Sequence, residues 1–228
     1  MSTEVESAPR VHGLLGRAHR LLDVPILFEI NQVVVDGGKR APVSRFLEEV
    51  EYDSVVDLGC GTGAWSYLAT GRYLGLDQSP SFIQGCKARF QKDARKRFEV
   101  GDLESMALEE DFDLALMMSV LHHLSDTQAE AALSRVAGRA RLLLVMDLIP
   151  IPRNPLSRLL YGLDRGDFIR SLEDQRAVLL RSGHWQLERE DSFHSYNRLY
   201  RHSLFLLRAV SSRNEAFSQS RRSTNDSH

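Results

Sequence analysis

The chain has 228 residues, which is enough for one α/β domain with a terminal extension and a sizeable core. Apolar residues make up 43% of the sequence, and 29 basic against 31 acidic residues leave a formal net charge of −2, so neither general disorder nor general affinity for nucleic acid is expected. The two cysteines exclude a disulfide framework and have no metal-ligand spacing, and no apolar run approaches the ~20 residues that cross a bilayer, so we expect a cytoplasmic protein without a transmembrane segment.

The N-terminal part of the chain predicts helices. Residues 1–10 are polar, and we expect them to be disordered. Apolar residues recur at helical spacing over 11–22 and 25–35, and a third short helix is expected over 42–50, with a proline in its first turn. We expect residues 11–50 to form a helical lid over a ligand. The first of these helices also carries basic residues beside leucines, so binding to a membrane surface is the alternative.

Short apolar runs then alternate with helical patterns up to residue 150. The alternation favours a parallel sheet covered by helices on both faces, in a doubly wound α/β arrangement. We expect residues 51–150 to form its cofactor-binding core. Strands are predicted at 54–58, 73–77, 97–100, 112–118 and 141–147, and helices at 79–91 and 126–137.

The pattern breaks after residue 150. Three prolines lie between 150 and 155, where no regular element can continue. A helix is predicted at 170–182, and two closing strands at 185–190 and 203–209, as a hairpin with a long connection. With these two strands, the mostly parallel sheet is predicted to have seven strands. Residues 150–210 are therefore interpreted as a substrate-side insertion and closing strands of one domain spanning 11–210, and the polar tail 211–228 is expected to be disordered.

The segment from Val55 to Gly63 links the first predicted strand to a predicted helix through glycines at 59, 61 and 63. Glycines permit a tight turn and a close approach of backbone to ligand, and the first turn of a helix presents unpaired N–H groups. The spacing differs from the G-x-G-x-x-G of dinucleotide-binding folds. Asp57, on the strand just before the turn, suits a cationic ligand better than a pyrophosphate.

The same segment resembles the first motif of class I S-adenosylmethionine-dependent methyltransferases, and residues 112–124 resemble the fourth motif of their small-molecule branch. The resemblance covers about residues 50–150 and implies a Rossmann-like fold, with S-adenosylmethionine as cofactor and S-adenosylhomocysteine as product. It departs from the family at residues 137–141, where many members have a proline-glycine-glycine turn.

The resemblance also implies residue roles. Asp77 would accept hydrogen bonds from both ribose hydroxyls, because a carboxylate accepts two at once. Asp102 and Leu103 would flank the adenine. The cofactor-binding residues expected on this basis are Asp57, Gly59, Cys60, Gly61, Gly63, Asp77, Gln78, Asp102, Leu103 and Met118.

Two histidines follow the fourth predicted strand and are the candidate bases. His122 and His123 lie at the same sheet edge as the glycine turn, and a histidine acts as a base near neutral pH. Asp147 ends the neighbouring strand and would orient one imidazole, as orienting carboxylates do elsewhere. The alternative is that one histidine packs against the cofactor while the other caps the next helix. The sequence does not choose between the two.

The acceptor pocket is expected to be built from parts outside the core sheet. Its candidate residues are Gln32, Tyr161, Arg165, Phe168 and Tyr196. Aromatic residues there favour a flat or apolar small molecule with a few polar groups. No Asn/Asp-Pro-Pro-aromatic tetrapeptide follows the fourth strand, so O- or C-methylation is favoured over N-methylation, in secondary or cofactor metabolism. We expect no metal and no nucleic-acid partner, and a monomer or a homodimer.

Four alternatives stay open. The fold may be used by an enzyme that transfers another part of the cofactor, or by a non-catalytic binding module. A protein or RNA methyltransferase would use the basic cluster between 87 and 97, which we interpret instead as the solvated face of a helix. A NAD-dependent dehydrogenase is disfavoured by the glycine spacing.

Overall fold

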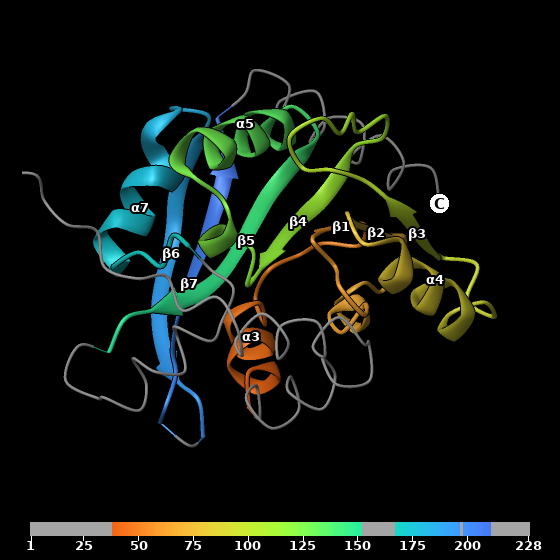
Figure 1. Ribbon diagram of the computed structural model, residues 1–228, viewed down its shortest axis with the longest axis horizontal. Helices are drawn as coiled ribbons and strands as arrows, with labels where there is room; N and C mark the ends of the chain where they lie inside the picture. The colour runs from red at the N-terminus through yellow and green to blue at the C-terminus, as the bar shows by residue number, and fades with distance from the viewer. Residues whose placement is uncertain (1–37, 152–166, 197, 211–228) are drawn as a thin grey trace, which may run out of the picture.

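A single seven-stranded sheet with helices on both faces forms the molecule (Figure 1). The computed structural model describes residues 38–151, 167–196 and 198–210. The predicted helices at 11–22 and 25–35 and the predicted disordered ends at 1–10 and 211–228 lie outside the described residues. No helix in the part that the structure describes is long and apolar enough to cross a membrane.

The sheet has the order β3-β2-β1-β4-β5-β7-β6, and β7 alone runs antiparallel to its neighbours. The prediction of a doubly wound, mostly parallel seven-stranded sheet is therefore confirmed. Strands β1 and β4 are buried along their whole length, as expected for parallel strands covered on both faces. The strands are β1 (Val55–Leu58), β2 (Tyr73–Asp77), β3 (Lys96–Val100), β4 (Phe112–Met118), β5 (Ala140–Ile149), β6 (Trp185–His194) and β7 (Arg201–Ala209).

Within residues 38–151, 167–196 and 198–210, four α-helices cover the sheet, two on each face. Helices α5 (Asp126–Ala137) and α7 (Leu172–Arg181) pack on one face, and α3 (Arg40–Phe46) and α4 (Pro80–Arg89) pack on the other (Figure 1). The helices α4, α5 and α7 each begin after a serine whose hydroxyl accepts a backbone N–H, which is the preferred N-cap chemistry. The positions of α4, α5 and α7 agree with the sequence-based prediction, whereas α3 begins two residues earlier and ends four residues earlier than the predicted range 42–50.

The connection after the glycine turn differs from the prediction. In place of the predicted helix, the chain forms turns and one short 3₁₀ helix, η1 (Ser66–Leu68). Only residues 64–72 separate the turn from β2, and their end is held to Asp53, which accepts the backbone N–H of Gly71 at 3.1 Å and the hydroxyl of Thr70 at 3.1 Å. The remaining segment is too short for several α-helical turns.

The closing strands are longer than predicted. Pairing between β6 and β7 continues to His194 and Arg201, so their connection has only six residues instead of the long one expected. Three hydrogen bonds between Ser195 and Tyr200 close this connection: the hydroxyl and the backbone N–H of Ser195 donate to the Tyr200 carbonyl, and the backbone N–H of Tyr200 donates to the Ser195 hydroxyl. Ladder pairing thus extends both strands to the sheet edge where β5 ends.

Candidate functional site

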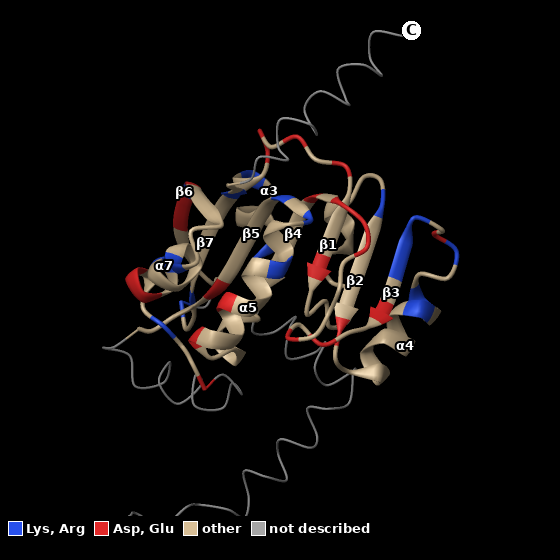
Figure 2. Cartoon of the chain, turned by 90° about the horizontal axis from the view of Figure 1, so that it is seen from above, with Lys and Arg blue, Asp and Glu red and all other residues tan. Residues whose placement is uncertain are grey.

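The carboxyl ends of β1, β2, β4 and β5 meet at one edge of the sheet. In open α/β sheets, ligands bind outside this edge. Asp57 and Asp77 lie near the ends of β1 and β2, and Figure 2 shows acidic colouring on both strands. The predicted site residues that follow these strands are therefore brought to a common edge.

Backbone geometry explains the glycines of the turn after β1. Gly59, Gly61 and Gly63 have φ values of 74°, 53° and 73°, in the left-handed region that other residues seldom adopt. A Cβ on Gly59 would lie 2.6 Å from Cγ2 of Val120, the residue two positions beyond β4. The turn therefore lies directly against the loop that follows β4, and a side chain at Gly59 would push the two apart.

Asp57 provides a buried carboxylate beneath the turn. Its Oδ2 accepts a 2.6 Å hydrogen bond from the hydroxyl of Tyr73, whereas its Oδ1 has no hydrogen-bond partner. Burial raises the pKa of Asp57, the Tyr73 hydrogen bond lowers it and the nearby charge of Asp77 raises it, so that together they bring this pKa to about 7. An unpartnered buried carboxylate oxygen fits a cationic group, such as the amino group of the cofactor that the resemblance implies.

Asp77 connects the glycine turn to the start of α4. Its Oδ2 accepts the backbone N–H of Gly61 at 2.9 Å, and its Oδ1 accepts the backbone N–H of Ser79 at 2.8 Å. Each carboxylate oxygen accepts up to two hydrogen bonds, so both retain acceptor capacity. This half-buried carboxylate is fixed in place and able to bind a pair of hydroxyls. Gln78 beside it is exposed.

The remaining predicted cofactor residues occupy varied environments. Cys60 is buried under the turn, and its Sγ would lie 2.9 Å from a Cβ on Gly75 of β2. Met118 is buried at the end of β4. After β3, Asp102 is exposed and accepts the backbone N–H of Glu104, while Leu103 packs partly buried against the core. Both follow the strand next to β2, on the side of Asp77.

His122 and Asp147 form a buried pair. His122 lies in the short 3₁₀ helix η2 (Leu121–His123) after β4, and its Nδ1 is 2.5 Å from Oδ1 of Asp147 in β5. Its backbone N–H also donates to Oδ2 of Asp147 at 3.0 Å. Both side chains are at most 3% exposed. Asp147 therefore fixes the ring orientation of His122, as the sequence suggested for one of the two histidines.

Three residues that the sequence analysis did not identify support this pair. The Ser203 hydroxyl lies 3.2 Å from the Asp147 carbonyl and 2.6 Å from Oε1 of Gln175, whose amide donates to the Leu148 carbonyl. On the other side, the Arg170 guanidinium donates to the carbonyls of Leu121 at 2.9 Å and Leu124 at 2.7 Å. The end of β5 is thus held by α7 and β7, and the loop that carries His122 is held by the segment before α7.

The other predicted residues lie around this pair or outside the described chain. His123 is exposed, and its ring centroid is 4.1 Å from that of His122. The backbone N–H of Phe168 donates to the His122 carbonyl at 3.0 Å, so this predicted substrate residue lies beside the pair. Tyr196 is 81% exposed and its ring lies against Gly38 instead. Gln32, Tyr161 and Arg165 lie outside the described residues.

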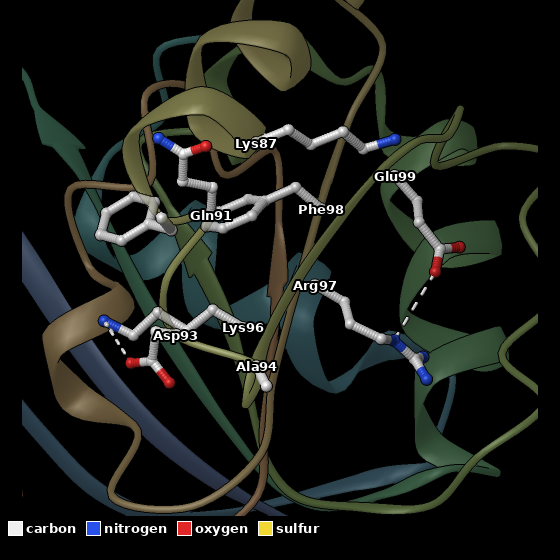
Figure 3. A pocket seen from close by; sticks show the side chains of 9 residues that line it. Lys87, Gln91, Asp93, Ala94, Lys96, Arg97, Phe98 and Glu99 are labelled. Carbon is white, nitrogen blue, oxygen red and sulfur yellow. Dashed lines mark ion pairs between the residues drawn. The ribbon is translucent and has the colours of Figure 1, made fainter.

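A separate shallow hollow of about 350 Å³ lies at the edge strand β3 (Figure 3). Its lining contains none of the predicted site residues. The basic cluster lies here, and the expectation of one helical face was wrong, because the cluster spans the end of α4, a turn and β3. Its charges are partly neutralised: Arg95 and Lys96 pair with Asp93 at 3.0 and 3.9 Å, and Arg97 pairs with Glu110 at 2.6 Å.

No three His, Cys, Asp or Glu side chains within residues 38–151, 167–196 and 198–210 are grouped so that they hold a metal ion. The polar side chains that the strands bring to this sheet edge include Asp57, Asp77 and the His122–Asp147 pair.

Comparison with known proteins agrees with this geometry. A family model described as a methyltransferase domain matches residues 55–141, which include the glycine turn, Asp77, Asp102 and η2. The chain is 32% identical over 112 residues to mRNA cap guanine-N(7) methyltransferase 1 of Arabidopsis thaliana, a match that covers 39% of this chain and 30% of that protein. The chain spans about a third of the length of the curated relatives it matches.

Solved structures share the fold. An S-adenosylmethionine-dependent methyltransferase from Mesorhizobium loti aligns with a TM-score of 0.59 at 22% identity, over 76% of this chain and 99% of that one. The N-methyltransferase NodS from Bradyrhizobium japonicum, in complex with S-adenosyl-L-homocysteine, aligns with a TM-score of 0.60 at 16% identity, over 84% and 91% of the two chains. Identities this low establish the likeness of the fold alone.

Proposed function

Because the chain belongs to the class I S-adenosylmethionine-dependent methyltransferase family, we propose that it transfers a methyl group from this cofactor to an oxygen or carbon atom of a small-molecule acceptor. The observation that carries the proposal is the buried His122–Asp147 pair, at the same sheet edge as the glycine turn. S-adenosylmethionine supplies, when bound, an electrophilic methyl group on a positively charged sulfur.

The residues around the glycine turn bind the cofactor. Oδ1 of Asp57 would receive its cationic amino group, and Asp77 would accept hydrogen bonds from its ribose hydroxyls. The glycines leave space for it against the backbone. Asp102 and Leu103 flank the adenine at the end of β3. A cofactor and an acceptor held together at this edge would react without first having to meet in solution, and such placement lowers a barrier by several kcal/mol.

His122 acts as the general base. With Nδ1 engaged by Asp147, proton transfer falls to Nε2, which takes the proton of the acceptor hydroxyl or acidic carbon as the methyl group is transferred. The Asp147 carboxylate then stabilises the imidazolium that forms. His123 is exposed beside His122 and takes no part in the proposed proton transfer.

The charges of the chain favour a small acceptor over nucleic acid. The net charge is −2, and several residues of the basic cluster are engaged in ion pairs. An RNA acceptor is the second candidate, because the Arabidopsis relative methylates guanine of the mRNA cap and is 32% identical over the matched segment.

A labelled-methyl assay tests the proposed function. Purified protein is incubated with methyl-tritiated cofactor and either a small-metabolite extract, total RNA or total protein. We expect label in the small-metabolite fraction only, and its loss in the His122→Asn variant. Label in RNA or protein would show that the acceptor is a macromolecule and would contradict the small-molecule proposal. No transfer to any fraction, by a protein that binds the cofactor, would favour a non-catalytic role.

Cofactor affinity is expected to depend on pH through Asp57. The folded-state pKa of about 7 lies above the usual 3.8, so Asp57 alone makes the unliganded protein less stable as the pH rises through 7. Binding of a cationic amino group needs the ionised carboxylate, so affinity changes in the opposite direction. We expect the Kd for S-adenosylhomocysteine to fall about tenfold between pH 6 and pH 8, measured by calorimetry.

The Asp57→Asn variant is the control for this pH dependence. It keeps the shape of the side chain but does not ionise, so its weaker binding should change little over the same range. A flat profile in the natural protein, with the affinity intact, would contradict the role of Asp57.

A further inference from the structure

His202 is a buried histidine for which the proposed mechanism has no use. It is 0% exposed, and among the described residues neither Nδ1 nor Nε2 has a hydrogen-bond partner. A polar group that is buried without a partner lowers stability, and buried polar groups in native proteins are nearly always paired. Such an unsatisfied imidazole is explained if it pairs with a ligand.

The position of His202 places it at the edge of the sheet where the reaction would occur. It is the second residue of β7 and pairs with Leu148, the residue after Asp147. The hydroxyl of the next residue, Ser203, contacts the backbone carbonyl of Asp147. His202 is also close enough to His122 for the two to interact electrostatically. His202 is therefore on the strand next to β5, which carries Asp147, the partner of the proposed base.

Aromatic rings flank this imidazole. The ring centroid of Phe193 lies 5.3 Å from that of His202, and the ring of Tyr200 lies 6.4 Å away at 18° from parallel. Flat apolar surfaces beside one polar group are typical of sites for planar ligands.

The charges around His202 favour an acidic ligand group. Burial lowers the pKa of His202 most strongly, and Lys39, His122 and His194 lower it further. Lys39, which precedes α3, is only 6% exposed. No carboxylate is among the groups that shift this pKa. A neutral imidazole retains one N–H donor, and the positive potential of its neighbours favours a negatively charged acceptor oxygen.

We propose that His202 binds the methyl acceptor, and that this acceptor is a planar molecule with an acidic oxygen, a carboxylate or a phenolate, which accepts the ring N–H of His202. The inference rests on the proposed function and adds the acceptor class to it. It assigns recognition of the acceptor to the face of the sheet covered by α3, in addition to the aromatic residues predicted from the sequence.

A purely structural role for His202 predicts a different outcome on substitution. The next residues of β7 on the same face, Leu204 and Leu206, are apolar and buried. An apolar side chain at position 202 would continue this pattern without unsatisfied nitrogens. The His202→Leu variant should therefore be more stable than the natural protein and should bind the acceptor less tightly, which is a combination that a packing residue does not give.

The test uses 4-hydroxybenzoate as an acidic planar probe and 4-hydroxybenzamide as its uncharged counterpart. Each is titrated by calorimetry into the full chain saturated with S-adenosylhomocysteine. We expect the acid to bind about tenfold more tightly than the amide, and the His202→Leu variant to bind the acid about tenfold more weakly. The variant should keep its affinity for S-adenosylhomocysteine and have a higher Tm. The exposed His184, replaced by leucine, is the matched control and should change neither probe affinity.

Three results would overturn the inference. The first is equal binding of the acid by the natural protein and the His202→Leu variant, and the second is an acid that binds no more tightly than the amide. The third is an absence of acid binding to a protein that binds S-adenosylhomocysteine. If the natural protein does not bind S-adenosylhomocysteine at all, the proposed function fails first and this inference fails with it.

Discussion

The Asp77→Ala variant is expected to bind S-adenosylhomocysteine about a hundredfold more weakly than the natural protein. The substitution removes the acceptor of two ribose hydroxyls, and each charge-assisted hydrogen bond contributes about 1.5–3 kcal/mol. It also removes the connection that Asp77 makes between the backbone N–H groups of Gly61 and Ser79. The turn loses its anchor to the start of α4, so the effect on affinity exceeds that of one lost contact. Calorimetry measures the change.

A matched control distinguishes the specific role of the Asp77 carboxylate from the loss of one negative charge on this side of the sheet. Glu99 lies in the neighbouring strand β3, is exposed, and pairs at the surface with Arg97 at 3.7 Å. The Glu99→Ala variant removes the same charge from the same side of the sheet and should leave the affinity unchanged. Equal affinity of the Asp77→Ala variant and the natural protein would remove Asp77 from the cofactor site.

The His122→Asn variant is expected to lower kcat by about 10²- to 10⁴-fold, which is the usual contribution of a general base. The Kd for S-adenosylhomocysteine should change little, because the glycine turn and Asp77 are untouched. The Asp147→Asn variant should also lower kcat, because an amide no longer accepts both the ring and the backbone N–H of His122. Single-turnover rates with the labelled cofactor measure the loss of activity in the two variants, and calorimetry measures the Kd.

The neighbouring histidine is the control for this prediction. The His123→Asn variant changes an exposed ring on the same short helix and should keep most of the activity. A Tm within a few degrees of the natural value shows that each variant has folded. The assignment would be reversed if His123→Asn abolished turnover while His122→Asn did not.

The strands of this fold were predictable because they follow a local rule. Parallel strands buried on both faces consist of mostly continuous apolar residues, as in Phe112–Met118. The helices α4, α5 and α7 each begin directly after a serine, which is a common N-cap residue. The segment after the glycine turn was predicted wrongly because its structure depends on length. Only residues 64–72 lie between Gly63 and β2, and hydrogen bonds to Asp53 hold the end of this segment, which forms turns and a short 3₁₀ helix.

The site was predictable where its residues follow strands. Asp57, Asp77 and His122 are adjacent to strand ends, so the topology alone brings them to one edge. Gln175 and Ser203 come from α7 and β7, and their contacts with the end of β5 depend on the three-dimensional packing. Gln175 did leave one sequence signal, as a polar residue at helical spacing with the buried Val178 and Leu179.

His202 left no such signal. Its position within an otherwise apolar strand resembles an ordinary core histidine, and only the unpartnered state of both ring nitrogens distinguishes it. Hydrogen-bond partners are a property of the folded chain, so a residue of this kind is identified from the structure.

The most direct test of the account is a calorimetric titration of the natural protein with S-adenosylhomocysteine, with NADH as the comparison. We expect a Kd in the micromolar range for S-adenosylhomocysteine and no binding of NADH, because the glycine turn and Asp57 suit a cationic ligand and not a pyrophosphate. Binding of NADH, or no binding of S-adenosylhomocysteine by a protein shown to be folded, would contradict the assignment of this sheet edge as a methyltransferase cofactor site.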